Sequence, residues 1–169
     1  PNIPWEILLK IEYLTFMLPM ICLSLFLRAF FPAEINLSAV KLYSALIILL
    51  SFFVLVTKVK IFSWIIVPYE ISLLAWGTYS IFILGLAVKR QREGSLLMLL
   101  GGTVMFFAAL NDVLYNNLIL RTGMFFPLGL FIFILFLAFV LAQRSATAFF
   151  KVEQFSSDLE QQVIERTHA

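Results

Sequence analysis

Residues 125–142 read FFPLGLFIFILFLAFVLA, and this stretch decides the fold class of the chain. It contains no charged residue, and as a helix it crosses most of a hydrocarbon core that is about 30 Å thick. Four further apolar runs precede it. In a bilayer every backbone N–H and C=O must be paired within the protein, so such runs form helices unless strands close into a barrel. Because the runs lack the short alternation of barrel strands, the sequence predicts helices.

The composition of the whole chain agrees with a protein that lies in lipid. Of its 169 residues, 62% are hydrophobic and 13% are charged, and the mean hydropathy is +1.01. A soluble domain carries about a quarter charged residues, so this chain has too few polar side chains for a surface in water. The predicted partner of its surface is the lipid bilayer. The net charge of only +2 and the lack of a basic cluster with interleaved aromatic residues predict no nucleic-acid partner.

The predicted fold is an all-α membrane protein, an antiparallel up-and-down bundle of five transmembrane helices. Short connections such as KVK at 58–60 make successive helices antiparallel neighbours. The last helix meets no Gly or Pro after residue 142, so it is predicted to continue into a cytoplasmic coiled-coil-like helix. The predicted parts are a transmembrane domain at 1–142, with spans at about 5–31, 37–57, 61–88, 94–120 and 123–142, and a linker helix at 143–169.

The distribution of Lys and Arg predicts the orientation of the bundle. One side collects seven of them near the helix ends, and the other side collects Lys10, Lys58, Lys60 and Arg121, which is four. Cytoplasmic loops carry the excess of positive charge, so the N-terminus is predicted outside and the C-terminus in the cytoplasm. Because the chain starts at Pro1 and ends within a polar helix, we interpret it as an internal fragment of a longer protein.

An apolar stripe in the polar tail predicts self-association. Its members recur at spacings of three, four and four, as in a coiled coil: Val152, Phe155, Leu159 and Val163. The pattern predicts a homodimer through the C-terminal helix. The alternative is a lone amphipathic helix lying on the membrane, but the acidic residues near the stripe suit anionic lipid poorly.

Polar residues interrupt two of the apolar runs. Within ALNDVLYNN at 109–117, Asp112, Tyr115 and Asn116 share one helix face, and Asn111 falls near Tyr115. A carboxylate at mid-membrane costs about 3 kcal/mol, so it should face the bundle interior or a wet cavity. The alternatives are a polar network that fixes helix packing, a ligand or ion pocket that opens outward, and a proton relay.

Glu70 is the second intramembrane carboxylate of the sequence. It follows Pro68, which is predicted to kink its helix because proline removes an N–H donor. Glu70 is predicted at a similar outer depth to Asp112, so the two carboxylates form one candidate polar cluster. The alternative is a packing kink with Glu70 reaching the outer headgroups.

Catalytic patterns are missing from the sequence. His168, close to the C-terminus, is its only histidine, and Cys22 is its only cysteine. Glycine-rich phosphate loops, nucleophile elbows and zinc-protease motifs do not occur. We therefore predict no enzyme within these residues, no cofactor, and no catalytic or metal site.

The C-terminal part of the chain resembles a known family. Residues 106–160 are similar to the end of the membrane domain of bacterial seven-transmembrane receptors with diverse intracellular signalling modules (7TMR-DISM). The resemblance lies in an ALNDxLY phrase, a short TG turn, a PxGLFxF helix and an RxxxAF exit. The matching residues are Asn111, Asp112, Leu114, Tyr115, Thr122, Gly123, Pro127, Gly129, Leu130, Arg144, Ala148 and Phe149.

The resemblance implies signal transduction in the bacterial cytoplasmic membrane. The five spans would be helices three to seven of a receptor for an unknown small extracytoplasmic ligand. The exit helix would lead to an effector: a histidine kinase of a two-component system, a diguanylate cyclase, a nucleotide cyclase or a phosphatase. The residues alone leave two alternative functions open. One is a transporter or channel fragment that uses Glu70 and Asp112 as ligands, and the other is a structural membrane subunit.

Overall fold

The computed structural model describes residues 4–167, with side chains through Phe155, and this part of the chain contains helices and loops without a strand. Five helices are long and apolar enough to cross a membrane, counting the segment from Val59 to Lys89 as one. The elements are α1 (Trp5–Phe30), α2 (Leu37–Val56), α3 (Val59–Phe62), the 3₁₀ turn η1 (Ser63–Ile65), α4 (Ile66–Lys89), α5 (Ser95–Asn116) and α6 (Phe126–Thr167). The predicted all-α bundle of five antiparallel spans is confirmed.

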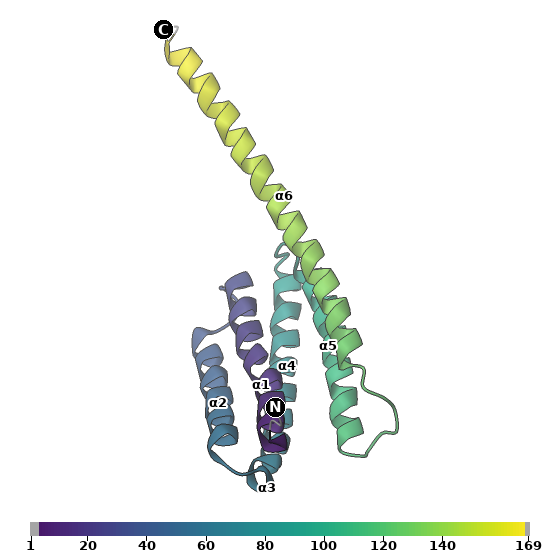
Figure 1. Ribbon diagram of the computed structural model, residues 1–169. Coiled ribbons are helices and arrows are strands. Elements are labelled where there is room, and N and C mark those ends of the chain that lie inside the picture. The colour runs from purple at the N-terminus through teal and green to yellow at the C-terminus, as the bar shows by residue number, and fades with distance from the viewer. Residues whose placement is uncertain (1–3, 168–169) are drawn as a thin grey trace.

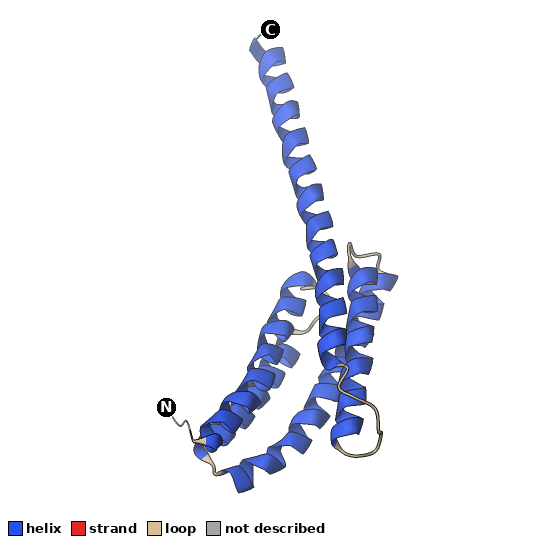
Figure 2. Ribbon diagram, turned by 45° about the vertical axis from the view of Figure 1, so that its right-hand side comes forward, coloured by secondary structure: helices blue, strands red, loops and turns tan. Residues whose placement is uncertain are grey.

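The bundle is divided into two packed groups with one helix between them. α1 and α2 form a hairpin on one side, α5 and α6 pair on the other, and α4 lies between the pairs (Figure 1). α6 is one continuous helix that leaves the bundle and extends far beyond it, as both views show (Figure 2). We call the end from which α6 leaves the exit end. The opposite end carries the long loop between α5 and α6, and we call it the loop end.

The third apolar run is interrupted upstream of Pro68. It is divided into α3, η1 and α4, and Pro68 lies in the first turn of α4. Proline fits the first turn of a helix because the N–H groups there have no partner inside the helix. In a longer helix the missing N–H of Pro68 would have left the carbonyl of Trp64 without its donor. The sequence predicted a kink at Pro68 within one helix, whereas the structure has a 3₁₀ turn, Ser63–Ile65, directly before α4 and Pro68 in the first turn of α4.

The fourth and fifth spans are shorter at the loop end than predicted. α5 ends at Asn116, where 120 was predicted, and α6 begins at Phe126, where 123 was predicted. The Asn117 side chain donates to the Val113 carbonyl at 2.8 Å, and Leu118 takes a positive φ of 59°. Both features end a helix, whereas the hydropathy of residues 117–120 by itself predicts that the span continues.

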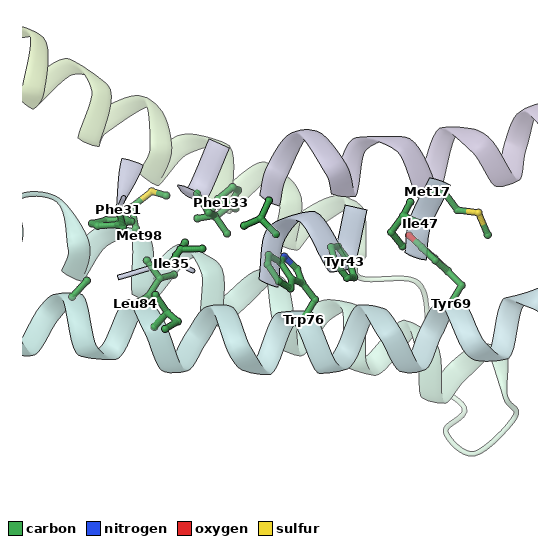
Figure 3. Close-up of a cluster of buried hydrophobic side chains, with 14 of the residues drawn as sticks. Met17, Phe31, Ile35, Tyr43, Ile47, Tyr69, Trp76, Leu84, Met98 and Phe133 are labelled. Atoms are coloured by element: carbon green, nitrogen blue, oxygen red, sulfur yellow. The ribbon is translucent and has the colours of Figure 1, made fainter. Parts of the chain in front are cut away.

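The buried core is apolar and runs along α4. Tyr43 of α2 stacks on Trp76 of α4 with ring centres 4.5 Å apart, and Met17 and Tyr69 lie toward the loop end (Figure 3). The Tyr69 hydroxyl donates to the Phe16 carbonyl at 2.9 Å, which ties α4 to α1. Outward-facing side chains of the spans are also mainly apolar and exposed, as expected where lipid replaces water.

The predicted dimer stripe lies only partly within the described side chains. Val152 and Phe155 are exposed, the latter at 70% of its surface. Leu159 and Val163 lie outside the described side chains. α6 is helical through this whole region, so the residues are held at helical spacing.

Candidate functional site

The Asp112 carboxylate holds the start of α6. Its Oδ1 accepts a hydrogen bond from the Phe125 backbone N–H at 2.7 Å, and its Oδ2 accepts one from the Phe126 N–H at 3.0 Å. Phe126 is the first residue of α6, so these are among the donors that a helix leaves unpaired at its N-terminus. A negative charge at this position is also favoured by the helix dipole. Asp112 of α5 therefore acts as the N-terminal cap of another helix.

The local sequence explains why α6 needs a cap from outside. The residue before α6 is Phe125, whose side chain has no hydrogen-bond acceptor, whereas Ser, Thr, Asp or Asn usually occupies this position. Asp112 lies four residues before the end of α5, about 6 Å inside that end by helix rise. The start of α6 is thus recessed toward the bundle, where water is scarcer and unpaired donors cost more.

Asn111 of α5 holds the loop that connects α5 to the start of α6. Its Nδ2 donates to the Gly123 carbonyl at 2.8 Å and to Asp112 Oδ1 at 3.1 Å. Its Oδ1 accepts from the Thr122 hydroxyl at 2.8 Å. Both hydrogen-bonding ends of the amide are therefore used. Asn111 and Asp112 were predicted site residues, whereas Thr122 and Gly123 were noted only as part of the family resemblance.

Glu70 belongs to a second network that joins α4 to the end of α5. Its Oε2 accepts from the Asn117 side-chain amide at 2.8 Å, and the residue is 7% exposed. The same amide holds the Val113 carbonyl. Asn117 was not among the predicted site residues, although it is the last Asn of the quoted ALNDVLYNN. Within the described side chains no hydrogen bond links the Glu70 network to Asp112.

Tyr115 and Asn116 lie outside both networks. Tyr115 is half-buried and Asn116 is exposed, and neither side chain hydrogen-bonds within the described part of the chain. An apolar cleft opens deeper in the bundle between α1, α4, α5 and α6. Neither Glu70 nor Asp112 lines this cleft; its walls include Leu27, Trp76, Phe106 and Phe133. Both Asp112 oxygens and Glu70 Oε2 accept hydrogen bonds from the protein's own donors.

A third polar region lies at the exit end. Glu34, in the turn after α1, has a side chain that is only 2% exposed, and its Oε1 lies 2.9 Å from Arg92 Nε and 3.6 Å from Arg90 Nη1. Arg144 of α6 donates through Nη2 to the Glu93 carbonyl at 3.0 Å. In the sequence these arginines served only as an orientation signal, so this cluster was not predicted. Within the described residues, no group of three acidic, His or Cys side chains is placed to hold a metal ion.

Comparison with known proteins identifies the chain at the family level. No curated protein and no solved structure matches it. A family model described as 7TM diverse intracellular signalling matches residues 1–144, which covers all five spans up to Arg144. Residues 4–144 of this range form the helical membrane bundle, with the capped α6 as its last span. The chain therefore belongs to the 7TM diverse intracellular signalling family of membrane domains.

Proposed function

We propose that this protein relays an extracytoplasmic signal through the bilayer to a cytoplasmic effector connected to the end of α6. The observation that carries the proposal is the continuity of α6. Its 42 residues run from Phe126 to Thr167 without interruption, about 63 Å by helix rise. Since the hydrocarbon core takes only about 30 Å, roughly half of the helix projects beyond it. A rigid rod of this kind can transmit a shift, tilt or rotation of its membrane part.

The proposal includes an orientation and a partner. The N-terminus lies outside a bacterial cytoplasmic membrane and the exit end lies in the cytoplasm, on the charge count given above. α6 pairs with α6 of a second copy through the stripe that contains Val152 and Phe155. The effector is a histidine kinase, a diguanylate cyclase, a nucleotide cyclase or a phosphatase. A ligand biases two arrangements of the α6 pair that differ by a few kcal/mol.

The test begins with the reading frame beyond Ala169 and then uses the full-length protein. One to seven alanines are inserted after Lys151, and the product of the encoded effector is measured in membranes. Each inserted residue rotates the following helix by about 100°, so output should rise and fall with helical phase. The seven-residue insertion should recover the original output because it restores the heptad phase.

Two results would refute the relay. One is a reading frame that ends shortly after Ala169 with no effector, because α6 would then have nothing to drive. The other is an output that stays the same for all seven insertions. A phase-independent output would mean that the effector does not respond to the rotation of α6.

A further inference from the structure

Within the described residues, the hydrogen bonds that α6 makes with other elements lie at two places. At its start, the Phe126 N–H is held by Asp112 of α5. At the exit end, Arg144 contacts the turn between α4 and α5 through the Glu93 carbonyl. The two places are about 27 Å apart by helix rise, close to the thickness of the hydrocarbon core. Between them α6 packs through apolar side chains, which allow sliding more readily than directed hydrogen bonds do.

Arg144 also reaches the first hairpin. Its guanidinium carbon lies 3.9 Å from the centre of the Phe30 ring and 5.8 Å from that of Phe31. Phe30 is the last residue of α1, and Phe31 is almost fully buried at the exit end of the core (Figure 3). A guanidinium over an aromatic face is attracted by the ring quadrupole. The Arg144 side chain of α6 thus contacts both the end of α1, at Phe30, and the α4–α5 turn, at the Glu93 carbonyl.

The two turns that Arg144 bridges are fixed to each other by the Glu34 ion pairs. The buried Glu34 carboxylate belongs to the α1–α2 turn, and its partners Arg90 and Arg92 belong to the α4–α5 turn. A carboxylate that is buried to this degree requires such partners. A displacement of the α1–α2 hairpin therefore also displaces the α4–α5 turn, which accepts the Arg144 hydrogen bond.

Close backbone packing places α6 against the same turn. Gly94 ends the turn with a φ of 76°, and a Cβ on it would lie 2.5 Å from Val140 Cγ1. Val140 is fully buried, one helical turn before Arg144. The contact fixes the position of α6 where it leaves the bundle. Arg144, one helical turn later, then sets the direction in which α6 leaves the bundle.

The Arg144 contact is incompletely satisfied. Its Nε is buried and has no hydrogen-bond partner in the described part of the chain. A buried donor without a partner weakens the arrangement that contains it relative to competing ones. A second position of α6 in which Arg144 Nε finds an acceptor can therefore compete with this one. The contact is for that reason suited to a conformational switch.

We propose that the exit-end cluster of Phe30, Glu34, Arg92, Glu93 and Arg144 is a latch that fixes the angle at which α6 leaves the bundle. Arg144 is its positioning residue. Movement of the α1–α2 hairpin shifts Phe30 and the α4–α5 turn together, and Arg144 converts that shift into a tilt of α6. This inference rests on the proposed relay: the latch is the contact through which the relay moves α6.

The test measures the position of α6 directly and needs no ligand or effector. Spin labels are attached at Lys41→Cys, near the start of α2, and at Ala148→Cys on α6, in full-length protein whose Cys22 is replaced by Ala. Distances between the labels are measured by pulsed electron resonance in lipid nanodiscs. The parent protein is expected to show one narrow distribution, whereas Arg144→Gln should give a broader distribution shifted to longer distances.

Further variants distinguish the loss of the latch contact from misfolding of the protein. Phe30→Leu keeps apolar packing but removes the ring face, so it should broaden the distribution as Arg144→Gln does. Arg144→Lys keeps a cation for the ring and should recover most of the narrow distribution. Arg121→Gln removes the same charge at the loop end and should leave the distribution unchanged. Monodisperse elution of each variant shows that it is folded.

The latch is overturned if folded Arg144→Gln and Phe30→Leu both give the distribution of the parent. A Lys variant as broad as the Gln variant would overturn the role of the cation. Neither result depends on an effector, so the latch can fail while the relay passes its insertion test. The converse also holds, because a narrow distribution that depends on Arg144 can occur in a protein without a cytoplasmic effector.

Discussion

At the scale of single residues, Asp112 shows how a polar side chain in an apolar run can be structural. Its two oxygens accept hydrogen bonds from the backbone N–H groups of Phe125 and Phe126. Asn111 holds the loop from the same turn of α5. These hydrogen bonds to backbone groups explain the presence of Asn111 and Asp112 in an apolar run without a bound ligand or a pocket.

Asp112→Ala is expected to lower the free energy of unfolding by about 0.5–2 kcal/mol, because it removes the acceptor that caps the N–H groups at the start of α6. Asp112→Asn keeps one carbonyl oxygen and should lose less. The measurement is equilibrium unfolding in detergent micelles. Asn116→Ala, four residues later on the exposed surface, serves as the matched control and should change stability by less than about 0.5 kcal/mol. Equal effects at both positions would show that the cap contributes nothing.

Asn117→Ala is expected to destabilise the protein by about 1 kcal/mol or somewhat more, since it removes the amide that pairs the buried Glu70 carboxylate. The double variant with Glu70→Gln should lose less than the sum of the two single changes, because the two residues share one hydrogen bond. Unfolding of the four proteins of this cycle gives the coupling. Strict additivity would exclude a direct interaction.

At the scale of elements, the contact between α5 and α6 depends on the absence of a side chain. A Cβ on Gly129 of α6 would lie 2.6 Å from the Ala108 Cβ and 3.2 Å from the Met105 Cα of α5. Backbones of spanning helices approach this closely only where residues are small. The close approach keeps the start of α6 beside Asp112.

Gly129→Ala is expected to cost about 1–3 kcal/mol of stability through overpacking. Gly85→Ala is the matched control, since a Cβ on Gly85 of α4 meets nothing within 4 Å. It should be neutral or slightly stabilising because alanine favours helix more than glycine does. Thermal unfolding of both variants in the same detergent gives the comparison. A neutral Gly129→Ala would mean that α5 and α6 separate without cost.

The projecting part of α6 provides the second prediction at this scale. In a dimer formed through the stripe, Phe155→Cys should cross-link efficiently under mild oxidation in membranes of the Cys22→Ala protein. Gln154→Cys, which lies away from the stripe on the helix, should cross-link weakly. The yield of covalent dimer on a non-reducing gel is the measurement. Similar yields at both positions would argue against a defined pairing face.

At the scale of the whole molecule, the loop end and the exit end carry different kinds of contact. The loop end is held by Asn111, Asp112, Glu70 and Asn117, together with Lys10 of α1, which donates to the Leu55 carbonyl of α2 at 3.1 Å. The exit end is held by arginines, with Glu34 between Arg90 and Arg92 and with Arg144 on Phe30. These exit-end arginines are among the residues on which the proposed orientation rests.

The proposed orientation predicts which end is reached from outside the cell. In the Cys22→Ala background, Arg121→Cys in the loop between α5 and α6 should react with a membrane-impermeant maleimide in intact cells. Lys151→Cys on the projecting part of α6 should react only after the membrane is permeabilised. The opposite pattern would place the exit end outside and would leave no route from α6 to a cytoplasmic effector.

The sequence by itself determined the fold class, the five spans and their antiparallel order, because hydropathy and short loops act locally and leave few alternatives in lipid. It also marked Asn111, Asp112 and Glu70 as unusual, since charge and amide groups in an apolar run are visible without coordinates. Only the tertiary structure decided what these residues contact. Asp112 serves a helix that begins fourteen residues later along the chain, and Asn117 rather than Asn116 pairs Glu70. The exit-end cluster brings together the turn after α1, the turn after α4 and the end of the α6 span. Contacts between segments so far apart depend on how the helices pack, and no local pattern of residues specifies that packing.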